Sequence, residues 1–180
     1  MKIKKFDKFL LEVKYNKNAY EYKPKDHFDK NGKKDGYDIY FDFINKDNIT
    51  KNYIMSLREF YDLELGKCYE IQYTVEEQFD MTNPEIYDKE TDDLKDIILR
   101  FYSKLLNILD DFIKKYFDYN INIAFGGNAK RPGKTEGYFD MANNYIKYIK
   151  PDDVNVEIMP TKDKYNLDAY ILKINKKENE

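Results

Sequence analysis

The residues of this chain best suited to binding chemistry lie in one glycine-rich loop, residues 126–137, which reads GGNAKRPGKTEG. The loop holds four of the seven glycines and three cations, with no acid before Glu136. Glycines allow successive backbone N–H groups to turn inward, and a following helix adds the positive end of its dipole. We therefore expect an anion site whose ligand is phosphate. The predicted contacts are Gly126, Gly127, Asn128, Lys130, Arg131, Gly133, Lys134, Thr135 and Tyr138.

A nucleotide-hydrolase P-loop is the first specific interpretation of this loop. Gly133-Lys134-Thr135 matches the end of the motif G-x-x-x-x-G-K-[ST]. The spacing argues against it, because the first glycine of the motif falls at Asn128 and because Pro132 removes one N–H from the phosphate cradle. Among the specific functions the sequence favours a loop that contacts phosphate of nucleic acid or of a free nucleotide. A plain exposed connection is the more common explanation of such a loop, but it would not need three cations here.

Tyrosines on predicted strands offer a second way to hold nucleic acid. Tyr37, Tyr40, Tyr69 and Tyr73 would stack on unpaired bases where they face water, each contact contributing roughly 1–3 kcal/mol. The alternative is packing at the rim of the core, because the chain has 18 Tyr and no Trp. The sequence favours the packed alternative.

Carboxylates raise the hypothesis of a metal-dependent or phosphate-handling enzyme acting on nucleotides. Asp38 and Asp42 share one face of a predicted strand, and paired carboxylates can hold Mg²⁺. Acids at alternating strand positions more often form the hydrated face, so we expect no catalytic residue, no metal and no cofactor. His27, the only histidine, falls in a polar segment predicted to be a solvated loop, and Cys68, the only cysteine, is predicted to be packed.

An acidic segment, residues 80–96, gives a different binding hypothesis. Such a segment can cover a basic surface on another protein, as an inhibitor or adaptor does, and its predicted contacts are Asp88, Asp92 and Asp93. The alternative is a solvated linker whose acids cap the helix that follows. The sequence leaves both alternatives open.

Composition and charge limit the classes of protein to consider. The chain has 180 residues, 36% of them charged, and a formal net charge of −3. A protein that coats nucleic acid through overall positive charge is not expected, so any contact must come from a local patch. The basic N-terminus has no apolar segment behind it, and no run reaches the roughly 20 apolar residues of a membrane helix. We expect a cytoplasmic protein with no membrane partner.

The first part of the chain is predicted to consist mainly of strands. We expect a single domain over residues 1–180, with a β-rich part at 1–80. Apolar and polar residues alternate clearly at 37–44 and at 67–75, which predicts two strands. Asp35-Gly36 is read as a break before the first of them, and residues 58–63 as a short helical turn.

The second part is predicted to be helical and then mixed. Apolar residues at helical spacing predict a long helix at about 91–118, with Leu105 and Phe112 buried. Residues 119–175 read as a strand, the loop, a shorter helix and two strands, the first of them broken at Pro160. Strands that precede a helix predict an α+β fold, with a mainly antiparallel sheet packed on one long central helix and a second shorter helix.

The sequence therefore predicts a non-catalytic cytoplasmic protein that binds nucleic acid or a nucleoprotein complex through its basic loop. Its size and composition suit an accessory factor of a phage or other mobile element. The first alternative is a protein inhibitor or adaptor that uses residues 80–96, and the second is the enzyme acting on nucleotides.

Overall fold

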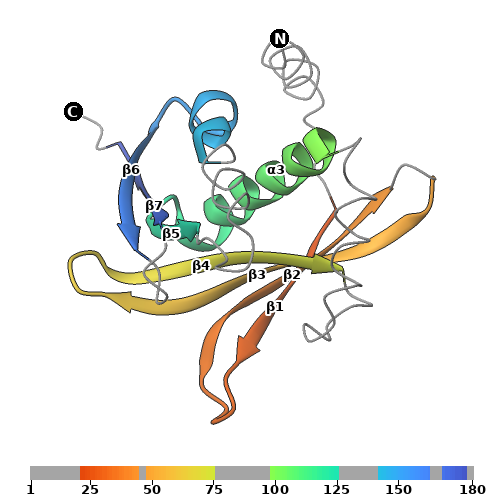
Figure 1. The fold of residues 1–180 in the computed structure, drawn as a ribbon, viewed down its shortest axis with the longest axis horizontal. Helices are drawn as coiled ribbons and strands as arrows, with labels where there is room; N and C mark the ends of the chain where they lie inside the picture. The colour runs from red at the N-terminus through yellow and green to blue at the C-terminus, as the bar shows by residue number, and fades with distance from the viewer. Residues whose placement is uncertain (1–20, 45–47, 76–97, 126–141, 163–167, 178–180) are drawn as a thin grey trace.

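The computed structural model describes residues 21–44, 48–75, 98–125, 142–162 and 168–177 (Figure 1). These residues form strands β1 to β7 and the helices α3 and η2, the latter a π-helical turn. The elements are, in chain order, β1 (Lys23–Phe28), β2 (Lys34–Ile44), β3 (Thr50–Asp62), β4 (Gly66–Val75), α3 (Ile98–Phe117), β5 (Ile121–Phe125), η2 (Tyr145–Ile149), β6 (Val154–Lys162) and β7 (Asp168–Lys176).

The strands form one mixed sheet in the order β1-β2-β3-β4-β5-β7-β6. Neighbouring strands are antiparallel except β4 and β5, whose parallel pairing places Tyr69 opposite Ile123. A parallel pair needs a long crossover, and the chain that carries α3 provides it. A mixed sheet with helices agrees with the predicted α+β class, while the arrangement around one long central helix remains a prediction.

The helix α3 packs on one face of the sheet because its apolar residues form a broad stripe at helical spacing (Figure 1). Leu105 and Phe112 are fully buried, which confirms their predicted place in the core. The ring of Phe101 lies among strand aromatics, with its centroid 4.8 Å from that of Tyr53 and 5.2 Å from that of Phe43. Burying one such phenylalanine contributes about 1.5–3 kcal/mol, so this packing fixes the helix-facing side of the sheet.

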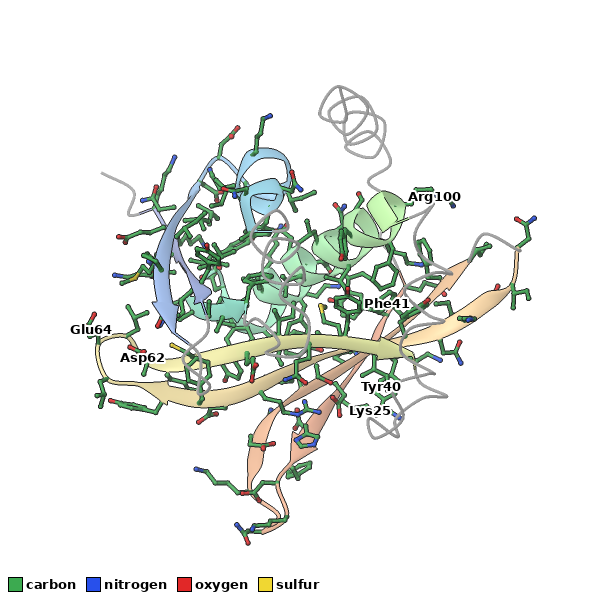
Figure 2. The ribbon with its side chains drawn as sticks, viewed as in Figure 1. Lys25, Tyr40, Phe41, Asp62, Glu64 and Arg100 are labelled. Carbon is green, nitrogen blue, oxygen red and sulfur yellow. The ribbon has the colours of Figure 1, made fainter. Side chains whose placement is uncertain are left out.

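Side chains alternate between the two faces of the sheet, as the pleat of a strand requires. Phe41 points toward α3, whereas Tyr40 and Lys25 lie on the opposite face (Figure 2). Cross-strand pairing places Asp38 opposite both Lys25 and Ser56, so these three residues share that opposite face. The face turned away from the helix, which we call the open face, therefore carries polar side chains of β1 to β3 beside the buried Ile54.

A half-buried carboxylate joins α3 to the second part of the chain. Asp110 accepts hydrogen bonds from the hydroxyls of Tyr145, at 2.8 Å, and Tyr119, at 3.2 Å. Burial raises the pKa of the Asp110 carboxyl, and the two tyrosine bonds only partly oppose this shift. The carboxylate thus holds the helix to η2 and to the residues just before β5.

The strands differ from their predicted boundaries in three places. Residues 58–63 do not form a helical turn, because β3 continues to Asp62 and stays paired with β4 as far as Gly66. Asp35-Gly36 is not a break, because both residues lie within β2. Pro160 does not interrupt β6, since β6 is the last strand of the sheet and an edge strand tolerates a missing N–H.

Candidate nucleic-acid interface

The first hairpin of the sheet forms an arm, which we define as residues 23–36: β1, its turn and the start of β2. The arm extends away from α3 and from the rest of the sheet (Figure 1). Its strands are antiparallel and in register from Lys23 opposite Tyr40 to His27 opposite Gly36, where the register shifts by a bulge. The result is a two-stranded ribbon at one edge of the sheet.

Asp29 builds the turn at the tip of the arm. Its Oδ1 accepts the backbone N–H of Asn31 at 2.8 Å and that of Lys33 at 2.9 Å, and its carbonyl accepts the N–H of Gly32 at 3.0 Å. The bond from Lys33, followed by that from Asn31, lowers the pKa of the Asp29 carboxyl. Gly32 has a φ of +76°, a conformation that favours glycine. The carboxylate of Asp29 is therefore bound by backbone N–H groups of the turn.

The other two aspartates of the arm are also engaged. Asp26 binds Lys34 at 2.7 Å, and this bond raises the pKa of the Lys34 ammonium, whose nitrogen also lies 4.2 Å from the centroid of the Tyr37 ring. Asp35 Oδ1 lies 2.5 Å from His27 Nδ1, across the bulge. His27 therefore lies in a paired strand, and the prediction that it occupies a solvated loop is wrong.

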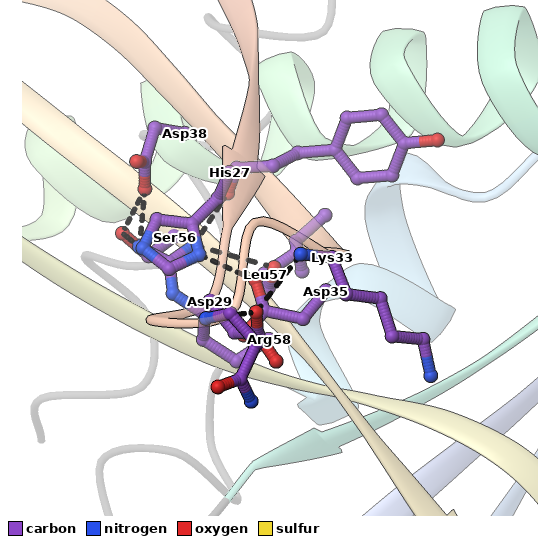
Figure 3. A network of polar contacts seen from close by, with 10 residues as sticks. His27, Asp29, Lys33, Asp35, Asp38, Ser56, Leu57 and Arg58 are labelled. Atoms are coloured by element: carbon purple, nitrogen blue, oxygen red, sulfur yellow. Dashed lines mark hydrogen bonds and ion pairs between the residues drawn. The ribbon is translucent and has the colours of Figure 1, made fainter.

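An arginine anchors the base of the arm to β3 (Figure 3). Arg58 Nη2 donates to Asp38 Oδ1 at 2.6 Å and to Ser56 Oγ at 3.3 Å, and Nη1 donates to the carbonyl oxygen of Tyr37 at 3.0 Å. Ser56 Oγ also donates to Asp38 Oδ1, at 2.7 Å. Asp38, one of the two carboxylates proposed from sequence as a metal ligand, is thus buried and held by a guanidinium.

Gly36 lets β2 approach β3 closely beside this arginine. A Cβ atom at Gly36 would lie 2.0 Å from the carbonyl oxygen of Leu57, a distance that no side chain tolerates. Gly36 pairs directly with Arg58 in the register of β2 and β3. The glycine read from sequence as a break is therefore required by a close backbone contact at the base of the arm.

The arm is basic, although the chain as a whole is acidic. It carries five lysines and three aspartates, a net charge of +2 with His27 neutral, whereas the whole chain has −3. The three aspartates keep their negative charges while they are engaged within the arm, so the net positive charge comes from the two additional lysines. Lys30 and Lys33 flank the turn, are exposed, and make no ion pair with the described part of the chain. Lys25 Nζ lies 4.5 Å from the centroid of the Tyr40 ring on the open face (Figure 2).

The residues singled out from sequence lie elsewhere. All nine predicted contacts of the glycine-rich loop fall outside the described residues, as do Asp88, Asp92 and Asp93 of the acidic segment. The described structure gives the two flanks of the loop. Strand β5 ends at Phe125, directly before it, and helical residues begin at 142. The strand and part of the helix predicted on either side of the loop are therefore present.

The tyrosines divide between the two faces of the sheet. Tyr37, Tyr69 and Tyr73 lie on the α3 side, where the ring of Tyr37, for example, is 5.1 Å from that of Phe112. Their packing confirms the core alternative for these three tyrosines. Tyr40 lies on the opposite face, where Lys25 Nζ lies over its ring. Cys68 is fully buried, as predicted, and burial raises the pKa of its thiol.

Sequence reasoning missed the arm because β1, which reads KPKDHF, shows no alternation of apolar residues. Its one signal is Asn31-Gly32 between two lysine-rich stretches, which is typical of a hairpin turn. The network at Arg58 has no signal in the sequence, since it depends on which residues the register of β2 and β3 brings together.

The arm presents exposed lysines, which attract anions, on a hydrogen-bonded two-stranded ribbon. Within the described residues, no group of three or more His, Cys, Asp or Glu residues is placed to hold a metal ion. None of the described helices is long and apolar enough to cross a membrane. No protein-family model, curated protein or solved structure gives a significant match to this chain.

Proposed function

We propose that this protein is a non-catalytic, cytoplasmic binding protein that engages nucleic acid, alone or within a nucleoprotein complex. The observation that carries the proposal is the arm, a basic two-stranded ribbon whose acidic side chains are all engaged within it. In this proposal a single domain, with α3 as its central helix, supports both the arm and the glycine-rich loop at residues 126–137.

The shape of the arm favours duplex DNA as its ligand. The major groove of B-DNA, about 12 Å wide, admits a two-stranded β-ribbon. Lys30 and Lys33 at the turn would reach phosphates on the walls of the groove, and Lys25 would lie along the ribbon. Each phosphate that a lysine neutralises releases condensed counterions, so binding should weaken steeply as salt is added.

The rigidity of the arm supports the same ligand. Asp29 fixes the turn, the pair of Asp26 and Lys34 joins the two strands, and Arg58 holds the base. A ribbon that is already folded loses little conformational entropy when it binds. In the proposal, Lys130, Arg131 and Lys134 of the glycine-rich loop add phosphate contacts of the same kind.

A second candidate function is an adaptor that binds another protein, to which Asp88, Asp92 and Asp93 would contribute. The exposed apolar side chains of the turn between β3 and β4 favour it, because they have no role in nucleic-acid binding. The metal-dependent enzyme is less well supported, since Arg58 holds Asp38.

A salt titration of binding to a labelled DNA duplex tests the proposal. In Lys30→Gln/Lys33→Gln, the slope of log K against log salt should become shallower by about 2, because each lost phosphate contact contributes about 0.9. The loop variant Lys130→Ala/Arg131→Ala/Lys134→Ala should flatten it further. Lys114→Gln/Lys173→Gln removes the same charge away from the arm and should leave the slope unchanged.

Two results would contradict the proposal. One is a wild-type protein that binds neither duplex nor single-stranded nucleic acid at low salt. The other is an arm variant whose slope and affinity equal those of the wild type, in which case the arm is not the contact surface.

A further inference from the structure

The end of the β3–β4 hairpin presents apolar side chains to water. We define the β3–β4 turn as residues 59–67, which are the end of β3, the connection and the start of β4. Leu63 is 96% exposed, Tyr61 77% and Phe60 36%. Asp62 and Glu64 mark the same turn at the far end of the hairpin (Figure 2). Single exposed apolar residues are common, but Tyr61 and Leu63 lie two positions apart at the same end of one hairpin, and exposed apolar side chains that gather in one place mark interaction sites.

The backbone of this turn does not need those side chains. Asp62 Oδ1 accepts the N–H groups of Glu64 and Leu65, both at 2.9 Å, and Gly66 has a φ of +73°. Glu59 binds Lys67 across the two strands at 2.6 Å. The turn is therefore fixed by polar groups and a glycine, and it holds its apolar side chains outward in a preformed arrangement.

The two leucines of the turn have opposite roles. Leu65 packs against a buried cluster on the open face of the sheet, formed by Cys68, Ala124 and Ile171. Leu63, two residues earlier, is almost fully exposed. Because Leu65 of the same turn packs against this cluster, a loosely packed turn does not explain the exposure of Leu63.

The net charge of the β3–β4 turn indicates which kind of partner it can bind. Residues 59–67 hold three acids and one lysine, a net charge of −2. Glu59 is paired with Lys67 and Asp62 binds backbone N–H groups, so Glu64 is the exposed acid that can face a partner. This charge repels the phosphates of nucleic acid and of anionic lipid. It complements a protein pocket that is apolar inside and lined at its rim by lysine or arginine.

We propose that the β3–β4 turn inserts Tyr61 and Leu63 into such a pocket on a partner protein. Tyrosine is enriched among the residues that dominate binding at protein interfaces, and a fixed turn presents it at low entropic cost. The inference rests on this turn alone, so it stands or falls independently of whether the arm binds nucleic acid.

Photo-crosslinking in cells that naturally contain the chain identifies the partner. A benzophenone amino acid in place of Leu63 should give a discrete adduct with one protein, and the same group in place of Phe28, exposed on the arm, should not. The cross-linked peptide of the partner should line an apolar pocket with lysine or arginine at its rim. The purified partner is then the binding probe for calorimetry.

The calorimetry compares matched variants that keep the fold. Tyr61→Ser/Leu63→Ser should weaken binding of that purified partner about tenfold or more, with an unchanged circular dichroism spectrum. Lys30→Gln/Lys33→Gln should bind it like the wild type. The proposal is overturned by an adduct only with nucleic acid or with a second copy of this chain, by no adduct above the Phe28 control, or by unchanged affinity of the Tyr61/Leu63 variant.

Discussion

Two hairpins of one sheet are built in the same way and carry opposite surfaces. In the arm, Asp29 accepts two backbone N–H groups of the turn and Gly32 takes a positive φ. In the β3–β4 turn, Asp62 and Gly66 do the same. The arm nevertheless has a net charge of +2 over residues 23–36, whereas the β3–β4 turn has −2 over residues 59–67 and exposes apolar side chains.

This contrast separates the residues that fix each hairpin from the residues that remain to contact a partner. An aspartate, a glycine and a cross-strand ion pair suffice to fix each turn. The lysines of one tip and the tyrosine and leucine of the other then serve no structural purpose that the described contacts reveal. These remaining side chains are the ones we assign to nucleic acid and to protein.

The largest effect should come from the core that both hairpins share. Phe101→Ala removes a ring packed on Tyr53 and Phe43, and it should lower the free energy of unfolding by about 3–5 kcal/mol. Urea denaturation measures this, with the milder Phe101→Leu as a control. Equal loss of structure in both hairpins is expected, and an unchanged midpoint would show that α3 does not support the sheet.

A change at the base of the arm should leave the end of the β3–β4 turn unaffected. In Gly36→Ala the new Cβ meets the carbonyl oxygen of Leu57, and overpacking of this kind costs about 1–3 kcal/mol. Amide chemical shifts should move in the arm and in β3 near Arg58, while those of residues 62–66, at the end of the β3–β4 turn, stay in place. Shifts spread equally over both hairpins would mean that the arm is not an independent unit.

The two turn glycines should respond alike. A Cβ atom at Gly32 or at Gly66 meets no atom within 4 Å, so the only penalty is the positive φ. Gly32→Ala and Gly66→Ala should each cost about 1–2 kcal/mol. Thermal unfolding measures both, and a large difference between them would show that the two turns are not built on the same principle.

The smallest effect should be an acid-dependent loosening of the arm turn. The pKa of the folded Asp29 carboxyl is lowered by bonds from the N–H groups of Lys33 and Asn31. Its contribution is therefore complete above the usual aspartate pKa and is lost as the pH falls through the lowered value. The amide shifts of Asn31 and Lys33 should change in that acid range, and Asp29→Asn should abolish the dependence. A turn whose shifts ignore pH would contradict the role of Asp29.

The sequence predicted the elements in which burial repeats regularly. The faces of β2 and β4 and the burial of Leu105 and Phe112 all follow from alternation or helical spacing, because one side of each element must meet the core. Gly36 was misread because a glycine that serves a turn and one that serves a close strand contact look the same in sequence. The continuation of β3 to Asp62 was missed because only pairing with β4 makes it a strand.

The candidate sites were less accessible to sequence reasoning. The arm contains no apolar repeat, and its charge becomes informative only once Asp26, Asp29 and Asp35 are seen to be engaged. The glycine-rich loop at residues 126–137 and the acidic segment at residues 80–96 remain predictions, since both lie outside the described residues.

Hydrogen–deuterium exchange, measured with and without a DNA duplex at low salt, tests the central claim most directly. The account predicts slower exchange in residues 23–36 on addition of DNA, further protection at residues 126–137, and no change at residues 59–67, because the acidic β3–β4 turn repels phosphate. Protection of residues 59–67 with an unchanged arm would reverse the assignment of the two hairpins and contradict the account.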